Sequence, residues 1–193
     1  MNRVCVFCGS SSGARAAYAR AAAETGELIA RRGLGLVYGG GHVGLMGVVA
    51  DAALRAGGSV VGVITQALKD REVAHDGLTE LHVVRTMHER KALMAALGDA
   101  FVVLPGGIWT LEEFFEVWTW GQLGEHAKPV GLVNAGGYYD GLVQFFDTML
   151  AEGFLKAKHR QMLVVGDTPA AVLDAFDRYE PPAVGKWIGP GEV

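Results

Sequence analysis

Short apolar runs, each followed by a glycine-rich turn and then a helical pattern, constrain the fold of this chain more than any other feature. The first two runs are RVCVFC, followed by GSSSG, and LGLVY, followed by GGGHVGLMG. A later run, AFVVL, leads into PGGIWTLEE and an aromatic helical pattern. Strands that alternate with helices in this way form a parallel sheet with helices on both faces. The sequence therefore predicts an α/β fold with a doubly wound parallel sheet.

The alternation continues to about residue 180 without a linker that would divide domains. Helices are predicted over 14–32 and 45–56, and the polar segment 65–77 is predicted to be a loop. With 193 residues, half of them apolar, the chain is long enough to bury a sizeable core. We expect residues 1–180 to form a single domain and the Gly/Pro-rich residues 181–193 to form a loosely ordered tail.

Composition argues against several classes of protein. The net charge is −4 and no basic stripe is visible, so nucleic acid is not an expected partner. No apolar stretch reaches the length of a membrane span, and the N-terminus has a strand pattern and not that of a signal peptide, so we expect no membrane partner and a cytoplasmic location. Cys5 and Cys8 form a CxxC, but within a strand they point to opposite faces, which predicts buried thiols and not a redox pair. The histidines lack metal-ligand spacing, so no metal site is predicted.

Three glycine-rich turns follow strands of the predicted sheet. They are residues 9–13, 39–44 (including Gly40 and Gly41) and 105–110. Because the carboxyl ends of parallel strands meet at one edge, all three turns belong to the same edge, where ligands bind in such folds. Glycine lets backbone N–H groups approach an anion, and each turn leads into a helix N-terminus. No turn matches GxGxxG or the Walker pattern, so the sequence predicts a site for a mononucleotide-sized phosphate ligand.

Arg90 stands near the start of a predicted helix in MHERKA, where a cation is disfavoured by the helix dipole. A solvated charged face would explain it without function. The unfavourable position favours a functional role instead, in which the guanidinium clamps phosphate or ribose oxygens.

Glu112 and Glu113 follow Thr110 in PGGIWTLEE, and two interpretations of Glu113 stand side by side. In the first, Thr110 is the N-cap of a helix and Glu113 completes a capping box. In the second, a carboxylate beside a phosphate loop stands over the sugar of a bound nucleotide. There it stabilises an oxocarbenium-like centre or activates water. A second acid that would protonate the leaving base is not evident.

The motifs GGGHVGLMG, MHERKA and PGGIWTLEE together resemble the LONELY GUY (LOG) family. Its members are cytokinin riboside 5′-monophosphate phosphoribohydrolases, often misannotated as lysine decarboxylases, and the resemblance covers nearly the whole chain. It implies a Rossmann-like fold, a homodimer, and no metal or organic cofactor. The implied substrate is a nucleoside 5′-monophosphate. The implied reaction is hydrolysis of the N-glycosidic bond of an N6-substituted adenosine monophosphate, giving the free base and ribose 5-phosphate.

The resemblance also implies roles for individual residues. Arg90 and Glu113 match the family's catalytic arginine and glutamate. Substrate contacts are implied for residues of the glycine turns and their neighbours, namely Gly40, Gly41, Lys91, Gly106, Gly107, Ile108, Trp109, Thr110, Leu111 and Glu112. Glu72 and Thr119 match more weakly as nucleotide contacts.

Trp109 departs from the family signature PGGxGTxxE, which has glycine at that position. A glycine there serves either a positive φ or close approach of the phosphate, and tryptophan suits neither. The loop is thus expected to be obstructed, reshaped or retuned. Two alternatives therefore remain open: a general AMP or nucleotide 5′-monophosphate nucleosidase, and a non-catalytic nucleotide-binding or sensing module. A lysine decarboxylase is disfavoured, because no local pattern points to a pyridoxal Schiff-base lysine.

Overall fold

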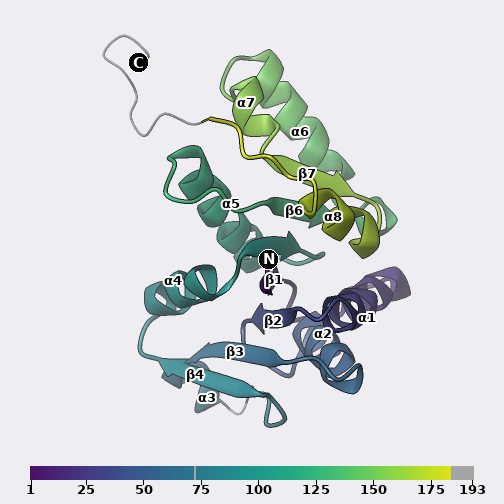
Figure 1. Ribbon diagram of the computed structural model, residues 1–193, viewed down its shortest axis with the longest axis vertical. Helices are drawn as coiled ribbons and strands as arrows, with labels where there is room; N and C mark the ends of the chain where they lie inside the picture. Colours follow the sequence, from purple (N-terminus) through teal and green to yellow (C-terminus); the bar gives the residue numbers. More distant parts are fainter. Residues whose placement is uncertain (72, 184–193) are drawn as a thin grey trace.

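A computed structural model describes residues 1–71 and 73–183, and one parallel sheet runs through it (Figure 1). The strand order is β4-β3-β2-β1-β5-β6-β7, and every pair of neighbouring strands is parallel. The strands are β1 (Arg3–Phe7), β2 (Gly35–Tyr38), β3 (Val60–Thr65), β4 (Glu80–Val84), β5 (Ala100–Val103), β6 (Val130–Val133) and β7 (Leu163–Gly166). The predicted doubly wound parallel sheet is confirmed.

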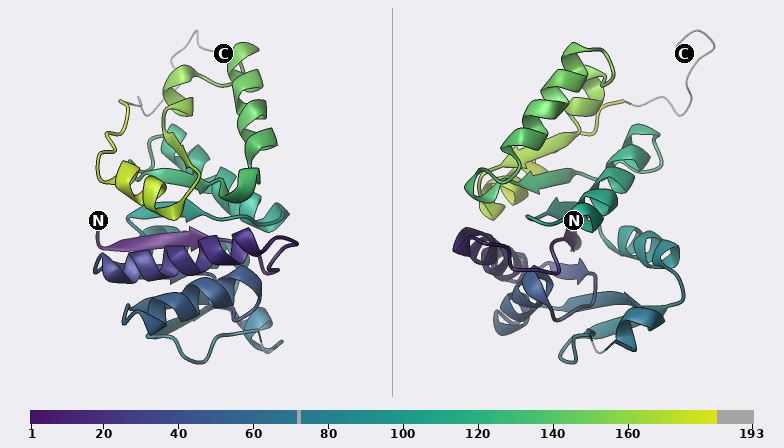
Figure 2. Two further views of the ribbon diagram at one scale, coloured as in Figure 1. Left: turned by 90° about the vertical axis from the view of Figure 1, so that its right-hand side faces the viewer. Right: turned by 180° about the vertical axis from the view of Figure 1, so that it is seen from behind.

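Helices cover both faces of the sheet, as Figure 1 and, from behind, Figure 2 show. One face carries α1 (Ala16–Arg31), α2 (Gly44–Arg55) and α8 (Pro169–Phe176), and the other carries α4 (Met87–Leu97), α5 (Ile108–Gln122) and α6 (Asp140–Ala151). Each face has its own apolar core. Cys8 belongs to the first and Cys5 to the second, which confirms that the two buried thiols point to opposite faces. Burial raises the pKa of both thiols.

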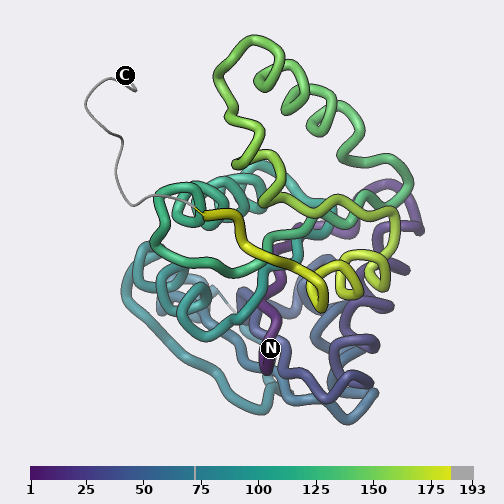
Figure 3. Tube along the Cα trace, turned by 45° about the horizontal axis from the view of Figure 1, so that its top comes forward, coloured from purple at the N-terminus to yellow at the C-terminus, as the bar shows by residue number. Residues whose placement is uncertain are grey.

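Short elements complete the described residues: α3 (Gln66–Lys69), α7 (Ala157–Arg160) and a 3₁₀ turn, η1 (Ala135–Gly137). The prediction that 65–77 is entirely a loop is wrong, because Thr65 caps α3 by accepting a hydrogen bond from the Leu68 amide. The hairpin of α6 and α7 projects at one end of the molecule (Figure 3). Residues 184–193, most of the predicted tail, lie outside the described residues, as does Glu72.

The strand order reverses between β1 and β5, which are neighbours in space although three strands separate them in sequence. At this switch point the turns that follow the two strands touch, because the Gly9 amide donates to the Pro105 carbonyl at 3.1 Å. An open α/β sheet has its ligand crevice beyond the carboxyl ends of such strands. Among the described residues, no helix is both long and apolar enough to cross a membrane.

Candidate active site

A cavity of about 600 Å³ opens at the switch point. It is walled by the turns after β1, β2 and β5, by the segment after β3, and by α2, α4 and α5. The residues that line it are Cys8, Gly9, Ser10, Gly39, Gly41, Val43, Met46, Ile64, Leu68, Val73, Arg90, Gly107, Ile108, Trp109, Thr110 and Glu113. The prediction that three glycine turns share one edge is therefore confirmed.

The N-terminus of α5 points at this cavity, and it begins earlier than the sequence pattern indicated. Gly107 is the N-cap and Ile108 the first helical residue, so Thr110 is the third residue of the helix. The capping-box interpretation of Thr110 and Glu113 is wrong. The side chain of Thr110 packs under Gly106, where an added Cβ would come within 2.2 Å of the threonine Oγ1. The first-turn amides, which have no acceptor within the helix, are left to face a ligand.

Glu113 lies in the second turn of α5, and its side chain turns into the protein. The residue is only 9% exposed, and its Oε1 accepts a hydrogen bond from Arg90 Nη1 at 3.3 Å. Burial raises the pKa of Glu113 to about 7, and the positive charge of Arg90 opposes this shift. A carboxyl with this pKa is close to half ionised at neutral pH, which suits a group that exchanges protons with a substrate or water.

Arg90 is the fourth residue of α4 and is 6% exposed. Backbone carbonyl groups of two other segments accept hydrogen bonds from its guanidinium. Its Nε donates to the Val63 carbonyl at 2.9 Å and its Nη2 to the Gly39 carbonyl at 3.0 Å. Gly39 is required by this contact, since a Cβ there would come within 2.1 Å of Nη2. Three of the five guanidinium N–H groups thus donate within the protein, counting the one to Glu113, and Arg90 also lines the cavity. The fork is held rigidly against the carboxylate.

Other predicted contacts lie away from the cavity. Lys91 and Glu112 bond to each other, with 2.5 Å between the ammonium nitrogen and the Glu112 Oε1, and Thr119 is exposed farther along α5. The predicted contact residues that do not line the cavity are Gly40, Lys91, Gly106, Leu111, Glu112 and Thr119. Sequence reasoning missed the apolar part of the wall, formed by Val43, Met46, Ile64, Leu68 and Val73.

A smaller hollow of about 280 Å³ adjoins the cavity and shares Gly9, Ser10 and Gly107 with it. It is lined by the serine-rich turn after β1 and the turn after β5, including Gly106. Tyr138 covers its side by donating a hydrogen bond from its hydroxyl to the Gly106 carbonyl at 2.6 Å. The lining of this hollow includes Ser10, Ser11 and Ser12, whose hydroxyls, with backbone amides of the glycine turns, are groups of the kind that bind anions.

Trp109 is the second residue of α5 and has a helical backbone. This position therefore does not require a positive φ. Of the two reasons for a glycine in the family signature, close approach of a ligand is the one that remains. The indole lines the cavity but is 71% exposed, and the neighbouring Ile108 is also exposed. Trp109 thus adds an exposed indole to the opening of the cavity, whereas the backbone at the N-terminus of α5 keeps its helical conformation.

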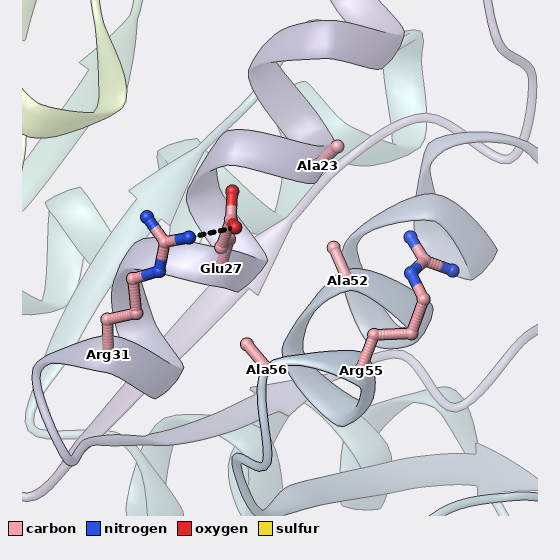
Figure 4. Close-up of a pocket in the computed structure, with 6 residues that line it drawn as sticks. All are labelled: Ala23, Glu27, Arg31, Ala52, Arg55 and Ala56. Atoms are coloured by element: carbon pink, nitrogen blue, oxygen red, sulfur yellow. Dashed lines mark hydrogen bonds and ion pairs between the residues drawn. The ribbon is translucent and has the colours of Figure 1, made fainter.

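Another hollow, of about 320 Å³, lies between the carboxyl-terminal halves of α1 and α2 (Figure 4). Its charged side chains are Arg55 and the pair in which Arg31 donates to Glu27 at 2.6 Å. Because helix ends of this kind lie at the amino edge of a parallel sheet, this hollow is on the edge opposite the cavity. No group of three or more metal-ligating side chains occurs among the described residues.

Fold and site together define an α/β protein with a small-molecule site at the switch point of a parallel sheet, built around a buried Glu–Arg pair. Residues 46–176 match the family described as "Possible lysine decarboxylase". The rice protein named "Probable cytokinin riboside 5′-monophosphate phosphoribohydrolase LOGL9" (Oryza sativa subsp. japonica) is 51% identical over 93% of this chain and 79% of its own. The Arabidopsis thaliana protein "Cytokinin riboside 5′-monophosphate phosphoribohydrolase LOG4" is 46% identical over 93% of this chain and 83% of its own. The chain belongs to the LOG family.

Solved structures agree on the fold. The molybdenum cofactor binding protein of Rippkaea orientalis superposes with a TM-score of 0.70 over 92% of this chain and 96% of its own. At 21% sequence identity this likeness shows the shared architecture alone.

Proposed function

We propose that this protein hydrolyses the N-glycosidic bond of N6-substituted adenosine 5′-monophosphates, releasing the free base and ribose 5-phosphate. The observation that carries the proposal is the buried Glu113–Arg90 pair, which lies in one cavity with the amino end of α5. The names of the curated relatives, which are 46–51% identical, support the same reaction.

In this proposal the 5′-phosphate binds the first-turn amides of α5 and the hydroxyls of Ser10 and Thr110. Anions are favoured there by free N–H groups and by the helix dipole. The ribose then extends from the phosphate toward Glu113. No nucleic acid, metal or organic cofactor is needed for this binding.

The reaction breaks the bond between C1′ and the base nitrogen, and the electron pair leaves with the base. Positive charge develops at C1′, where an ionised Glu113 stabilises it and accepts a proton from the attacking water. The water oxygen bonds to C1′, the departing base takes up a proton from solvent, and Glu113 returns the proton of the attacking water to solvent, so that one water is consumed. Arg90 holds the carboxylate in place and keeps enough of it ionised at neutral pH.

The apolar wall favours an N6-substituted base over plain adenine. Met46, Leu68 and Val73 give the cavity a hydrophobic end that an isoprenoid substituent would cover. The broader alternative, a general nucleoside 5′-monophosphate nucleosidase, predicts equal use of AMP. The non-catalytic sensing module gains its only support from the altered loop at Trp109.

We further propose a homodimer and a cytoplasmic location. The exposed apolar side chains Phe115 on α5 and Phe145 on α6 suit a subunit interface. Two free thiols suit a reducing compartment. Light scattering coupled to size-exclusion chromatography tests the dimer, and a monomer at micromolar concentration would contradict it.

The test of the activity is incubation of the purified protein with three compounds: isopentenyladenosine 5′-monophosphate, AMP and isopentenyladenosine. Free base is measured by chromatography. We expect the first compound to be cleaved fastest and the nucleoside slowest, because it lacks the phosphate. Equal rates with AMP would favour the general nucleosidase, and tight binding without base release would favour the sensing module.

A further inference from the structure

Two adjacent tyrosines from the segment between β6 and α6 bind the turn that leads from β5 into α5. The Tyr139 hydroxyl donates to the Leu104 carbonyl at 2.7 Å, and the Tyr138 hydroxyl donates to the Gly106 carbonyl at 2.6 Å. The carbonyl between them, that of Pro105, accepts a hydrogen bond from the turn after β1. Three successive carbonyl groups of the turn are thus held by donors from neighbouring segments.

Tyr138 is in turn held by its own neighbours. Its ring meets the ring of Tyr18 on α1 edge-on, with 5.4 Å between the centroids, and meets that of Tyr139 at 4.9 Å. Two residues before it, the Gly136 carbonyl accepts a hydrogen bond from the Arg15 guanidinium at 3.1 Å. Packing within the protein therefore presents the Tyr138 hydroxyl to the turn.

The hydrogen bond from Tyr138 sets the orientation of the peptide group between Gly106 and Gly107. In a trans peptide the carbonyl and the following N–H point in opposite directions, so the Gly107 N–H is turned away from Tyr138. Among the described residues, the Gly107 amide donates no hydrogen bond to the rest of the protein, and Gly107 lines both the cavity and the smaller hollow. A peptide between two glycines rotates readily when nothing holds it, because neither residue has a Cβ.

We infer that Tyr138 is a positioning residue for the phosphate: it holds the Gly106–Gly107 peptide in the orientation in which the Gly107 amide donates to an anion. The inference rests on the proposed function, which places the 5′-phosphate at the amino end of α5. The hydroxyl proton of Tyr138 is committed to the Gly106 carbonyl, so Tyr138 acts through the peptide group.

Tyr139 supplies a matched control within the same turn. Its hydroxyl also binds a carbonyl, but the peptide that it orients joins Leu104 to Pro105, and proline has no N–H to offer a ligand. Tyr138→Phe and Tyr139→Phe each remove one oxygen and keep the ring. Both variants therefore lose one hydrogen bond to the turn, and only the first frees a peptide that carries a donor.

The experiment uses the full chain as the parent and the two phenylalanine variants. Isothermal titration calorimetry gives the Kd of ribose 5-phosphate and of isopentenyladenosine, and steady-state kinetics give kcat and KM for isopentenyladenosine 5′-monophosphate. In ¹⁵N-glycine-labelled protein, NMR follows the Gly107 amide proton as ribose 5-phosphate is added. Its signal is identified by its loss in Gly107→Ala, which the fold accommodates because φ is −89° and an added Cβ meets nothing within 4 Å.

Tyr138→Phe should weaken the binding of ribose 5-phosphate about three- to tenfold, because a peptide that samples a second orientation binds in proportion to its competent fraction. KM for the monophosphate should rise by a similar factor, while kcat stays within about twofold. Isopentenyladenosine, which has no phosphate, should bind all three proteins within about twofold, and Tyr139→Phe should bind both ligands like the parent. The Gly107 amide proton of the parent should move downfield when ribose 5-phosphate binds.

An unchanged Kd for ribose 5-phosphate in Tyr138→Phe would overturn the inference. An equal loss in Tyr139→Phe, or an equal loss for isopentenyladenosine, would also overturn it, since either result indicates a general loosening of the turn. If Tyr138→Phe fails to fold, the parent decides, because a Gly107 signal that does not move downfield contradicts the proposed donor. These binding measurements need no turnover. Absence of base release by the parent would therefore refute the proposed function and leave this test intact.

Discussion

Replacing Glu113 by glutamine separates the electrostatic cost of this residue from its chemistry. Glutamine has nearly the same shape but no ionisable proton, so the α5 backbone and the packing around the side chain are retained. We expect Glu113→Gln to abolish base release, because the amide neither stabilises a positive C1′ nor accepts a proton from water. Nucleotide binding should persist, since the proposed phosphate contacts are amides and hydroxyls elsewhere in the cavity.

The magnitude of the stability effect follows from the shift of the carboxyl pKa. The pKa of Glu113 rises from its ordinary 4.5 to about 7 in the folded protein because of burial. Between these values the native state binds more protons than the unfolded state, so its stability falls as pH rises through this window. Between pH 5 and pH 8 the loss amounts to about 2–3 kcal/mol. In Glu113→Gln this contribution is absent.

The assay is urea unfolding of both proteins at pH 5 and pH 8. Other titrating groups are shared by parent and variant and cancel in the comparison. The free energy of unfolding of the variant relative to the parent should therefore increase by about 2–3 kcal/mol between the two pH values. The carboxylate proposed for catalysis would thus lower the free energy of unfolding at neutral pH, which is a trade-off between activity and stability.

Two results would refute this reasoning. An unchanged stability difference between pH 5 and pH 8 would mean that the folded carboxyl titrates at its ordinary pKa. Equal turnover by variant and parent would remove Glu113 from the reaction whatever its pKa.

Two further predictions concern the neighbours of Glu113. Arg90→Lys should lower kcat at least tenfold and lower the free energy of unfolding by about 1–3 kcal/mol, because one ammonium cannot satisfy the Val63 and Gly39 carbonyls and Glu113 together. Steady-state kinetics and urea unfolding measure the two effects, and values equal to those of the parent would show that Arg90 has no positioning role. Trp109→Gly should raise kcat/KM for the monophosphate roughly tenfold, because it opens the α5 amides to phosphate, and should leave kcat/KM for the nucleoside nearly unchanged. The free energy of unfolding should change by less than about 1 kcal/mol, since the indole is exposed. A lower monophosphate value would make the indole a working part of the cavity wall.

The position of the site was predictable because it depends on topology more than on detail. Strands were recognisable as apolar runs, and in a parallel sheet the turns after them must share an edge. The contact between Gly9 and Pro105 at the switch point follows from that rule once β1 and β5 are neighbours. The family resemblance then directed attention to Arg90 and Glu113 within that edge.

The start of α5 could not be predicted from the local pattern. Thr110 and Glu113 have the spacing of a capping box, which is a rule about a few residues of isolated helix. In the folded chain the turn after β5 delivers Gly107 as the N-cap, and Thr110 is drawn beneath Gly106 by packing. Tertiary contacts thus placed the start of the helix before Thr110. The sequence alone contains no signal that these contacts would outweigh the local capping preference.

The division of labour between Arg90 and Lys91 was equally invisible in sequence, where the two cations form one motif. Their roles separate only through the phase of α4 relative to α5. The same rotation that buries one guanidinium between Val63, Gly39 and Glu113 delivers the adjacent ammonium to Glu112 and Glu116. The cation that contacts Glu113 and the cation that contacts Glu112 and Glu116 thus differ by one position in the chain, and only the packing of α4 against α5 tells them apart.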